Sequence, residues 1–136
     1  MLASPLHEVL ACALVWIAMG LVGVFQPRNF WLVTRVLLPA GAIIGLPIAA
    51  IALAAIFSAP TSLVLPLGLP DLPFHARLDA LSCFFLLLLG SVSAGVSVFA
   101  AGYFRRGEGT PPGLQCVSYH VFLASMAFVL IADDAY

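Results

Sequence analysis

Apolar residues fall into four long uncharged blocks, and every charged position lies between or beyond them. The blocks cover residues 9–25, 36–57, 80–103 and 116–132. Each has the roughly 17–25 residues that a helix needs to cross the hydrocarbon core of a bilayer. Because a chain in lipid must satisfy its own backbone hydrogen bonds, we predict four transmembrane helices. The expected fold class is an all-α, polytopic membrane protein.

The composition also indicates that the chain is solvated by lipid. Of 136 residues, 63% are apolar and only 8% are charged, against about 25% charged in a typical soluble domain. So few charges cannot cover the surface of a soluble domain of this length. The chain has no basic stripe for nucleic acid and no linker or internal repeat, so we expect one membrane-embedded unit whose first partner is the lipid bilayer.

The first apolar block has one alternative interpretation, a cleaved signal peptide. Secretory signals carry positive charge before their apolar core. The segment "MLASPLHEV" has no Lys or Arg and contains Glu8 instead. The missing basic region favours a retained helix.

The five basic residues, all arginines, predict the orientation. Arg28 and Arg35 lie between the first two blocks, and Arg105 and Arg106 between the last two, whereas the loop between the second and third holds only Arg77. Basic loops stay on the cytoplasmic side of a membrane. We therefore expect the amino terminus outside and a multi-pass protein of the inner (cytoplasmic) membrane.

The two longer loops differ in their predicted structure. The outer loop, "SAPTSLVLPLGLPDLPFHARLD", contains four prolines, which rule out a regular helix. Within it, "TSLVLPLGL" has a β-like composition and predicts a short edge strand. The inner loop, "FRRGEGTPPGLQ", is interpreted as a connector with glycines and a proline pair as helix breakers.

Asp79, in "RLDALS", stands where the third helix should begin. Its carboxylate can accept a hydrogen bond from the N–H of Leu81 or Ser82 and so cap the helix. Its negative charge also suits the helix dipole. Arg77 is close enough to pair with it or with a lipid headgroup. The alternative interpretation places Asp79 in an ion path.

His120 is expected one turn inside the fourth helix, near its cytoplasmic end. An ionisable group in a membrane is a functional candidate, and histidine titrates near neutrality. His120 either bonds a neighbouring carbonyl or Tyr119, or it relays protons. Asp134 cannot meet it, because fourteen residues of helix span about 21 Å. At helical spacing the face of His120 includes Ala124, Ala127, Ile131 and Asp134.

Small residues predict close helix packing. "GAIIG", from Gly41 to Gly45, matches the GxxxG pattern for helix contact. Ser91, Ser93 and Ser97 are expected to bond the carbonyls of their own helix, with a polar seam as the alternative.

The cysteines show no metal-binding pattern. The spacing of Cys12, Cys83 and Cys116 fits no zinc or cluster motif, so we interpret them as small buried residues. A phosphate-binding loop and a nucleophile elbow are both missing from the sequence. We therefore expect no cofactor, no metal and no catalytic chemistry in this segment.

Two long stretches carry a family resemblance. "LPFHARLDALSCFFLLLLGSVSAGVSVFAAGYFRR" and "YHVFLASMAFVLIADDAY" resemble the proton-translocating antiporter-like membrane subunits of complex I, Mrp antiporters and hydrogenases. The likeness is strongest to the large membrane subunit of hydrogenase-4 and formate hydrogenlyase. It spans residues 69–136. The matching positions are Asp79, Leu81, Ser82, Gly102, Tyr103, Ser125, Met126, Ala132, Asp133 and Asp134.

The resemblance implies that the chain is the amino-terminal portion of a subunit with about fourteen helices. Such a subunit has its amino terminus outside and moves protons for a redox complex such as NADH:quinone oxidoreductase. Its fifth helix carries a glutamate and its seventh a lysine, and both positions lie beyond Tyr136. The four helices would be scaffold for the first half-channel, bound to other membrane subunits. The candidates for a helix cap or proton path are Asp79, His120, Asp133 and Asp134.

Two rival functions remain open. A self-contained four-helix transporter would match the size, but its coupling needs a carboxylate within the first helix. Residues 9–25 contain none, and Glu8 is at the membrane margin. The other rival is a non-catalytic membrane assembly subunit.

Overall fold

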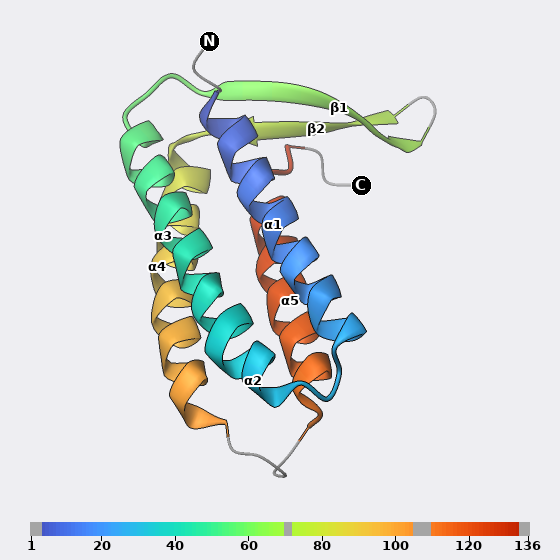
Figure 1. The fold of residues 1–136 in the computed structure, drawn as a ribbon. Helices are drawn as coiled ribbons and strands as arrows, with labels where there is room; N and C mark the ends of the chain where they lie inside the picture. The colour runs from blue at the N-terminus through green and yellow to red at the C-terminus, as the bar shows by residue number, and fades with distance from the viewer. Residues whose placement is uncertain (1–3, 70–71, 105–109, 134–136) are drawn as a thin grey trace.

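The computed structural model describes residues 4–69, 72–104 and 110–133 and consists of a helical bundle with one β-hairpin (Figure 1). The first long helix is α1, and the last two are α4 and α5. The second rod is continuous and consists of the short helix α2, a π-helical turn (η1) and α3. The elements in chain order are α1 (Pro5–Phe25), α2 (Phe30–Leu32), η1 (Val33–Leu37), α3 (Leu38–Ala55), β1 (Thr61–Leu69), β2 (Leu72–Leu78), α4 (Ala80–Tyr103) and α5 (Pro112–Ile131).

Four of the described helical segments are long and apolar enough to cross a membrane, as predicted. They are Pro5–Phe25, Phe30–Ala55, Ala80–Tyr103 and Pro112–Ile131. The third agrees with the predicted range. The other three begin four to six residues before the apolar blocks that predicted them, because the first helical turns include polar residues that hydropathy alone leaves out.

Prolines open two of these helices. Pro5 and Pro112 occupy the first turns of α1 and α5, where the missing N–H of proline has no partner to lose and its fixed φ suits the helix. The backbone N–H of Gln115 donates to the Pro111 carbonyl at 3.1 Å, which closes the first turn of α5. The predicted connector is therefore shorter than expected, because residues 112–115 already belong to α5.

The second rod contains a π-helical turn that ends at Leu37, two residues before Pro39. Asn29 caps its start, since the side chain accepts a hydrogen bond from the Leu32 N–H at 3.1 Å. The N–H of Leu38 then donates to the carbonyl of Val33, which is the i→i+5 spacing of a π-helix. Pro39 cannot donate a backbone hydrogen bond. The change from i→i+5 to i→i+4 hydrogen bonding therefore occurs next to a residue that lacks an N–H donor.

Two helix pairs form the bundle. The antiparallel α3 and α4 pack closely, as do α1 and α5, whereas α4 and α5 touch each other far less. Glycines make the close approach possible, and the prediction for "GAIIG" is confirmed. A Cβ on Gly41 would lie 2.6 Å from Ser97 Oγ, and one on Gly23 would lie 2.7 Å from Cys116 Cβ.

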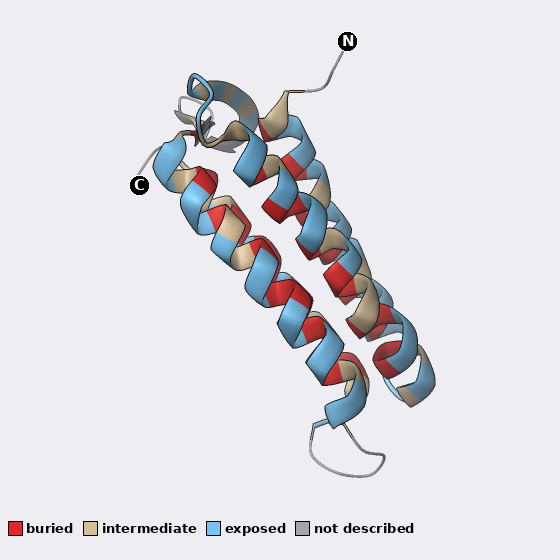
Figure 2. Ribbon diagram, turned by 90° about the vertical axis from the view of Figure 1, so that its left-hand side faces the viewer, coloured by how far each residue is buried: buried red, intermediate tan, exposed pale blue. Residues whose placement is uncertain are grey.

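The buried residues face the interior of the bundle (Figure 2), and many large hydrophobic side chains are exposed on its outside. Trp16, Ile48 and Leu86 are among the largest fully buried side chains of the core. The exposed face of each long helix also carries large hydrophobic side chains, including a Val129 on α5 that is 69% exposed. A soluble protein rarely exposes so much apolar surface, whereas lipid solvates it.

The β-hairpin crosses the end of the bundle where α1 begins and α5 ends (Figure 1). β1 and β2 are antiparallel, and their register shifts between Leu65 and Gly68, around Pro66. Leu63, Leu65 and Phe74 pack against the helical core. The predicted strand at β1 is confirmed, but its partner strand was missed.

Candidate functional site

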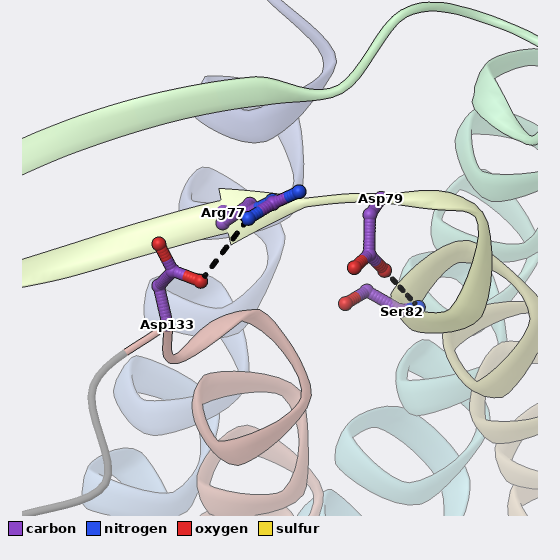
Figure 3. A network of polar contacts seen from close by, with 4 residues as sticks. All are labelled: Arg77, Asp79, Ser82 and Asp133. Atoms are coloured by element: carbon purple, nitrogen blue, oxygen red, sulfur yellow. Dashed lines mark hydrogen bonds and ion pairs between the residues drawn. The ribbon is translucent and has the colours of Figure 1, made fainter.

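The hairpin end of the bundle holds the first group of candidate residues (Figure 3). Asp79 lies between β2 and α4, at the N-cap position of α4. Its Oδ1 accepts a hydrogen bond from the Ser82 N–H at 2.8 Å, which is the predicted N-cap. The Ser82 N–H is the main cause of a lowered pKa of the Asp79 carboxyl; partial burial opposes it, and the Ser82 hydroxyl and the charge of Arg77 assist it.

Asp133 lies beside Arg77, on a different element from Asp79. Arg77 on β2 forms an ion pair with Asp133, just after α5, with 3.7 Å between Nη1 and Oδ1 (Figure 3). The sequence had offered Asp79 or a lipid headgroup as the partner of Arg77, and the partner in the structure is Asp133. The Asp133 N–H also donates to the His75 carbonyl at 3.0 Å. Asp134 lies outside the described residues.

These contacts fasten the end of α5 to the hairpin. Ala132 forms an isolated antiparallel bridge with Ala76, on the edge of β2 that does not pair with β1. Asp133 thus serves the joint between two elements. Within the described residues, the geometry at Asp79 and Asp133 is that of a helix cap and a surface ion pair.

His120 lies further inside its helix than predicted. Because α5 begins at Pro112 rather than at Cys116, His120 is eight residues inside the helix, a rise of about 12 Å. The expected depth of one turn was wrong. The side chain is fully buried, and it shares the inward face of α5 with Ala124, Ala127 and Ile131, as predicted.

The hydrogen bonds of His120 define the roles of its two ring nitrogens. Nδ1 lies 2.9 Å from the Cys116 carbonyl oxygen. A carbonyl can only accept, so Nδ1 carries the hydrogen and Nε2 is the acceptor in the neutral ring. Nε2 is buried without a hydrogen-bond partner in the described residues. It faces Gly41, where an added Cβ would lie 3.4 Å away.

A second polar contact joins α4 to α5 beside His120. The Tyr119 hydroxyl donates to the Ser93 carbonyl at 3.1 Å and lies 2.9 Å from Ser97 Oγ. Because the single tyrosine hydrogen goes to Ser93, the Ser97 hydroxyl is the donor to Tyr119. The prediction that Ser97 bonds its own helix was wrong. Ser93 does so, with its hydroxyl donating to the Gly90 carbonyl at 2.9 Å.

The interior offers little chemistry beyond these groups. The buried polar side chains among the described residues are Thr34, Ser93, Ser97 and His120. In that part of the chain, no three His, Cys, Asp or Glu side chains gather in a way that would hold a metal ion. Cys83 and Cys116 are buried, as predicted, and Cys12 is partly buried.

The comparisons with known proteins leave the family open. No family model, curated protein or solved structure matches this chain. The resemblance of residues 69–136 to the antiporter-like subunits therefore stays a prediction from the sequence.

Sequence reasoning missed three features of these sites. The pairing of Arg77 with Asp133 depends on β2, whose alternating Leu72, Phe74, Ala76 and Leu78 were a usable strand signal. The Tyr119–Ser97 bond joins helices, so no local pattern contains it. The depth of His120 follows from the preference for proline in a first helical turn, a signal that was present at Pro112.

Proposed function

We propose that these four helices are the scaffold of the first half-channel in a proton-translocating membrane subunit of a redox-driven complex. The complex is of the hydrogenase-4, formate hydrogenlyase or NADH:quinone oxidoreductase type. The proposal rests on the resemblance carried by Asp79, Ser82, Asp133 and their neighbours, and on the chemistry of the bundle interior. The unit works with other membrane subunits in the inner membrane.

The carrying observation is the lack of buried charge. No Asp, Glu, Lys or Arg is among the buried residues of the described chain, although transported ions need such groups at depth. Among the described residues, His120 is the single buried side chain of a type whose unperturbed pKa lies near neutrality. The helices thus have the character of a scaffold, and the translocating carboxylate and lysine belong to other helices.

The packing suits a bracing role. Glycines interlock α3 with α4, with a Cβ on Gly90 lying only 2.7 Å from the Ala49 nitrogen. At the outer end, Asp133 and Arg77 join α5 to the hairpin. A bundle fixed along one helix pair and at one end holds its neighbours at constant spacing, as a half-channel requires.

Proton flux in proteoliposomes tests the proposal. The chain reconstituted alone, with an internal pH dye and an imposed potential, should pass protons no faster than empty liposomes. The physical reason is the cost of moving charge through hydrocarbon without a titratable stop. The coding sequence beyond position 136 is a second test, since the proposal expects a fifth apolar segment that contains a glutamate.

One observation favours a second candidate, a small self-contained proton transporter. His120 lies about 12 Å inside α5, with a free Nε2 and the Tyr119–Ser97 hydroxyl pair on the adjacent face. Flux from the chain alone that disappears in His120→Ala and persists in Ser125→Ala, an exposed α5 control, would establish this candidate and overturn the scaffold proposal.

A further inference from the structure

His120 has one ring nitrogen that the folded chain leaves unused. The side chain is fully buried, and its Nδ1 is bonded to the Cys116 carbonyl of its own helix. Nε2 is buried as well and has no hydrogen-bond partner in the described residues. Buried polar atoms are nearly always paired, so an unpaired nitrogen inside a helical bundle requires an explanation.

The second rod has a backbone acceptor at the level of Nε2. This nitrogen lies 3.4 Å from the position of a Cβ added to Gly41. In a helix each carbonyl points toward the N–H four residues on, so the Leu37 carbonyl points toward Gly41. The Leu37 backbone is also a hydrogen-bond acceptor for the charged form of the ring. Leu37 and Cys116 pack in the same buried cluster, so the acceptor and the ring meet where α5 touches η1.

The Leu37 carbonyl is able to accept a bond from the ring. Leu37 is the N-cap residue of α3, whose carbonyl accepts the first hydrogen bond of that helix. A carbonyl oxygen has two lone pairs, so one lone pair is left. In the neutral ring, Nε2 and this oxygen are both acceptors and cannot bond. A proton on Nε2 turns it into a donor.

The acceptor belongs to the irregular part of the second rod. Leu37 ends η1, in which the Leu38 N–H donates to the Val33 carbonyl. The Thr34 carbonyl therefore loses its usual donor, because the next residue along, Pro39, has no N–H. Single π-helical turns of this kind are frequent at functional sites. A hydrogen bond from α5 to the end of η1 thus acts on a segment whose own ladder is already interrupted.

Few titratable groups face the ring from the elements packed around it. On α5 they are Cys116, whose Sγ lies 3.5 Å from Nδ1, and Tyr119, whose ring centroid is 5.2 Å from that of His120. Arg35, the charged residue of η1, is exposed. The residues beside the ring on the other helices are uncharged: Gly20 of α1, Gly41 of α3 and Ser97 of α4. Within the described chain, a charge on His120 is therefore met by carbonyl oxygens.

We propose that His120 is a proton-controlled latch between α5 and the second rod. With a proton on Nε2, the ring donates to the Cys116 carbonyl through Nδ1 and to the Leu37 carbonyl through Nε2, and it ties α5 to η1. Without that proton, only the bond within α5 remains and η1 is released. The latch binds a proton and returns it without passing it across the membrane, so it does not rest on the proposed function.

Solid-state NMR of the full chain in lipid bilayers tests the latch without a mutation. The chain carries ¹⁵N in its histidines and ¹³C in its leucine carbonyls. At about pH 8, His120 should have its hydrogen on Nδ1 and none on Nε2. At about pH 5, where histidine is charged, Nε2 should be protonated and magnetisation should pass between it and one leucine carbonyl. Leu37→Ile keeps the side-chain volume but removes the ¹³C label, so it should abolish that transfer.

Amide hydrogen exchange measures the effect on η1. After correction for intrinsic exchange rates, protection of residues 33–37 should rise about tenfold between about pH 8 and about pH 5, the effect of one hydrogen bond to a charged group. In His120→Gln, which cannot be charged, the protection should stay within twofold. His7→Gln is the matched control, because His7 is exposed on α1, and it should behave as the wild type.

Two results would overturn the latch. The first is a His120 ring whose Nε2 stays unprotonated at about pH 5, or carries the hydrogen in place of Nδ1 at about pH 8. The second is a charged ring without transfer to Leu37 and with equal protection of η1 at both pH values, which would make His120 a packing residue. Neither measurement depends on proton flux through liposomes, so failure of the latch and failure of the proposed function are distinguishable.

Discussion

Gly45 of α3 and Gly90 of α4 approach so closely that a Cβ added to Gly90 would lie 2.5 Å from the Gly45 carbonyl oxygen. That atom is backbone and cannot move aside without moving the helix. The contact lies at the centre of the largest helix–helix interface in the described chain. The spacing between α3 and α4 is therefore set by residues without side chains.

Gly90→Ala should destabilise the bundle by about 1–3 kcal/mol, the usual cost of overpacking a well-packed core. Gly95→Ala is the control on the same helix, because an added Cβ there meets nothing within 4 Å. Alanine is the better helix former by about 0.8–1.0 kcal/mol, so the control should be neutral or more stable. Unfolding in mixed detergent micelles, followed by circular dichroism, measures both. Equal effects at the two positions would contradict the packing account.

The cap of α4 gives a second prediction. Asp79→Ala should lower the free energy of unfolding by about 0.5–2 kcal/mol, because the Ser82 N–H loses its acceptor. Asp79→Asn should be nearly silent at neutral pH, since asparagine also caps helices. The same unfolding assay compares the three proteins. A full-size loss in Asp79→Asn would show that the charge, and not the hydrogen bond, matters at this position.

The cap also has a defined pH dependence. The Ser82 N–H lowers the pKa of Asp79 in the folded state, so the carboxylate contributes stability that is fully present above its unfolded pKa of about 3.9. That contribution is lost as the pH falls through the lower, folded-state pKa. We therefore expect the free energies of unfolding of the wild type and of Asp79→Asn to depend differently on pH below about pH 4. Above that pH, the two free energies should change with pH in the same way.

Features that local sequence patterns encode could be predicted from the sequence alone. Uncharged runs predicted the four spans, "GAIIG" predicted the glycine interface, and Asp79 at a helix start predicted the cap. Features that depend on contacts between two distant segments could not be predicted in this way. Tyr119 and Ser97 are 22 residues apart, and nothing near either one specifies the other. Hydropathy also placed the start of α5 too late, since polar residues in its first turn diluted the signal.

Arg77 and Asp133 provide a further prediction, on the joint between the hairpin and the end of α5. Their side chains are 47% and 43% exposed, so solvent screens the pair and its coupling energy should be about 0.2–1 kcal/mol. A double-mutant cycle with Arg77→Gln and Asp133→Asn measures that coupling. The coupling should shrink in high salt, because exposed charges are screened. A coupling above this range that is insensitive to salt would instead indicate a pair shielded from water.

The last prediction concerns the orientation of the bundle in the membrane. Ser58 lies just after α3, beside the hairpin, and Gln26 caps the opposite end of α1; both are exposed. Because Arg28 and Arg35 belong to the Gln26 end, basic loops should hold that end in the cytoplasm. In intact cells or right-side-out vesicles, a membrane-impermeant maleimide should label Ser58→Cys directly and Gln26→Cys only after permeabilisation. The unmodified chain supplies the background, since Cys83 and Cys116 are buried and Cys12 is partly buried. Direct labelling of Gln26→Cys, without labelling of Ser58→Cys, would show that the bundle has the opposite orientation.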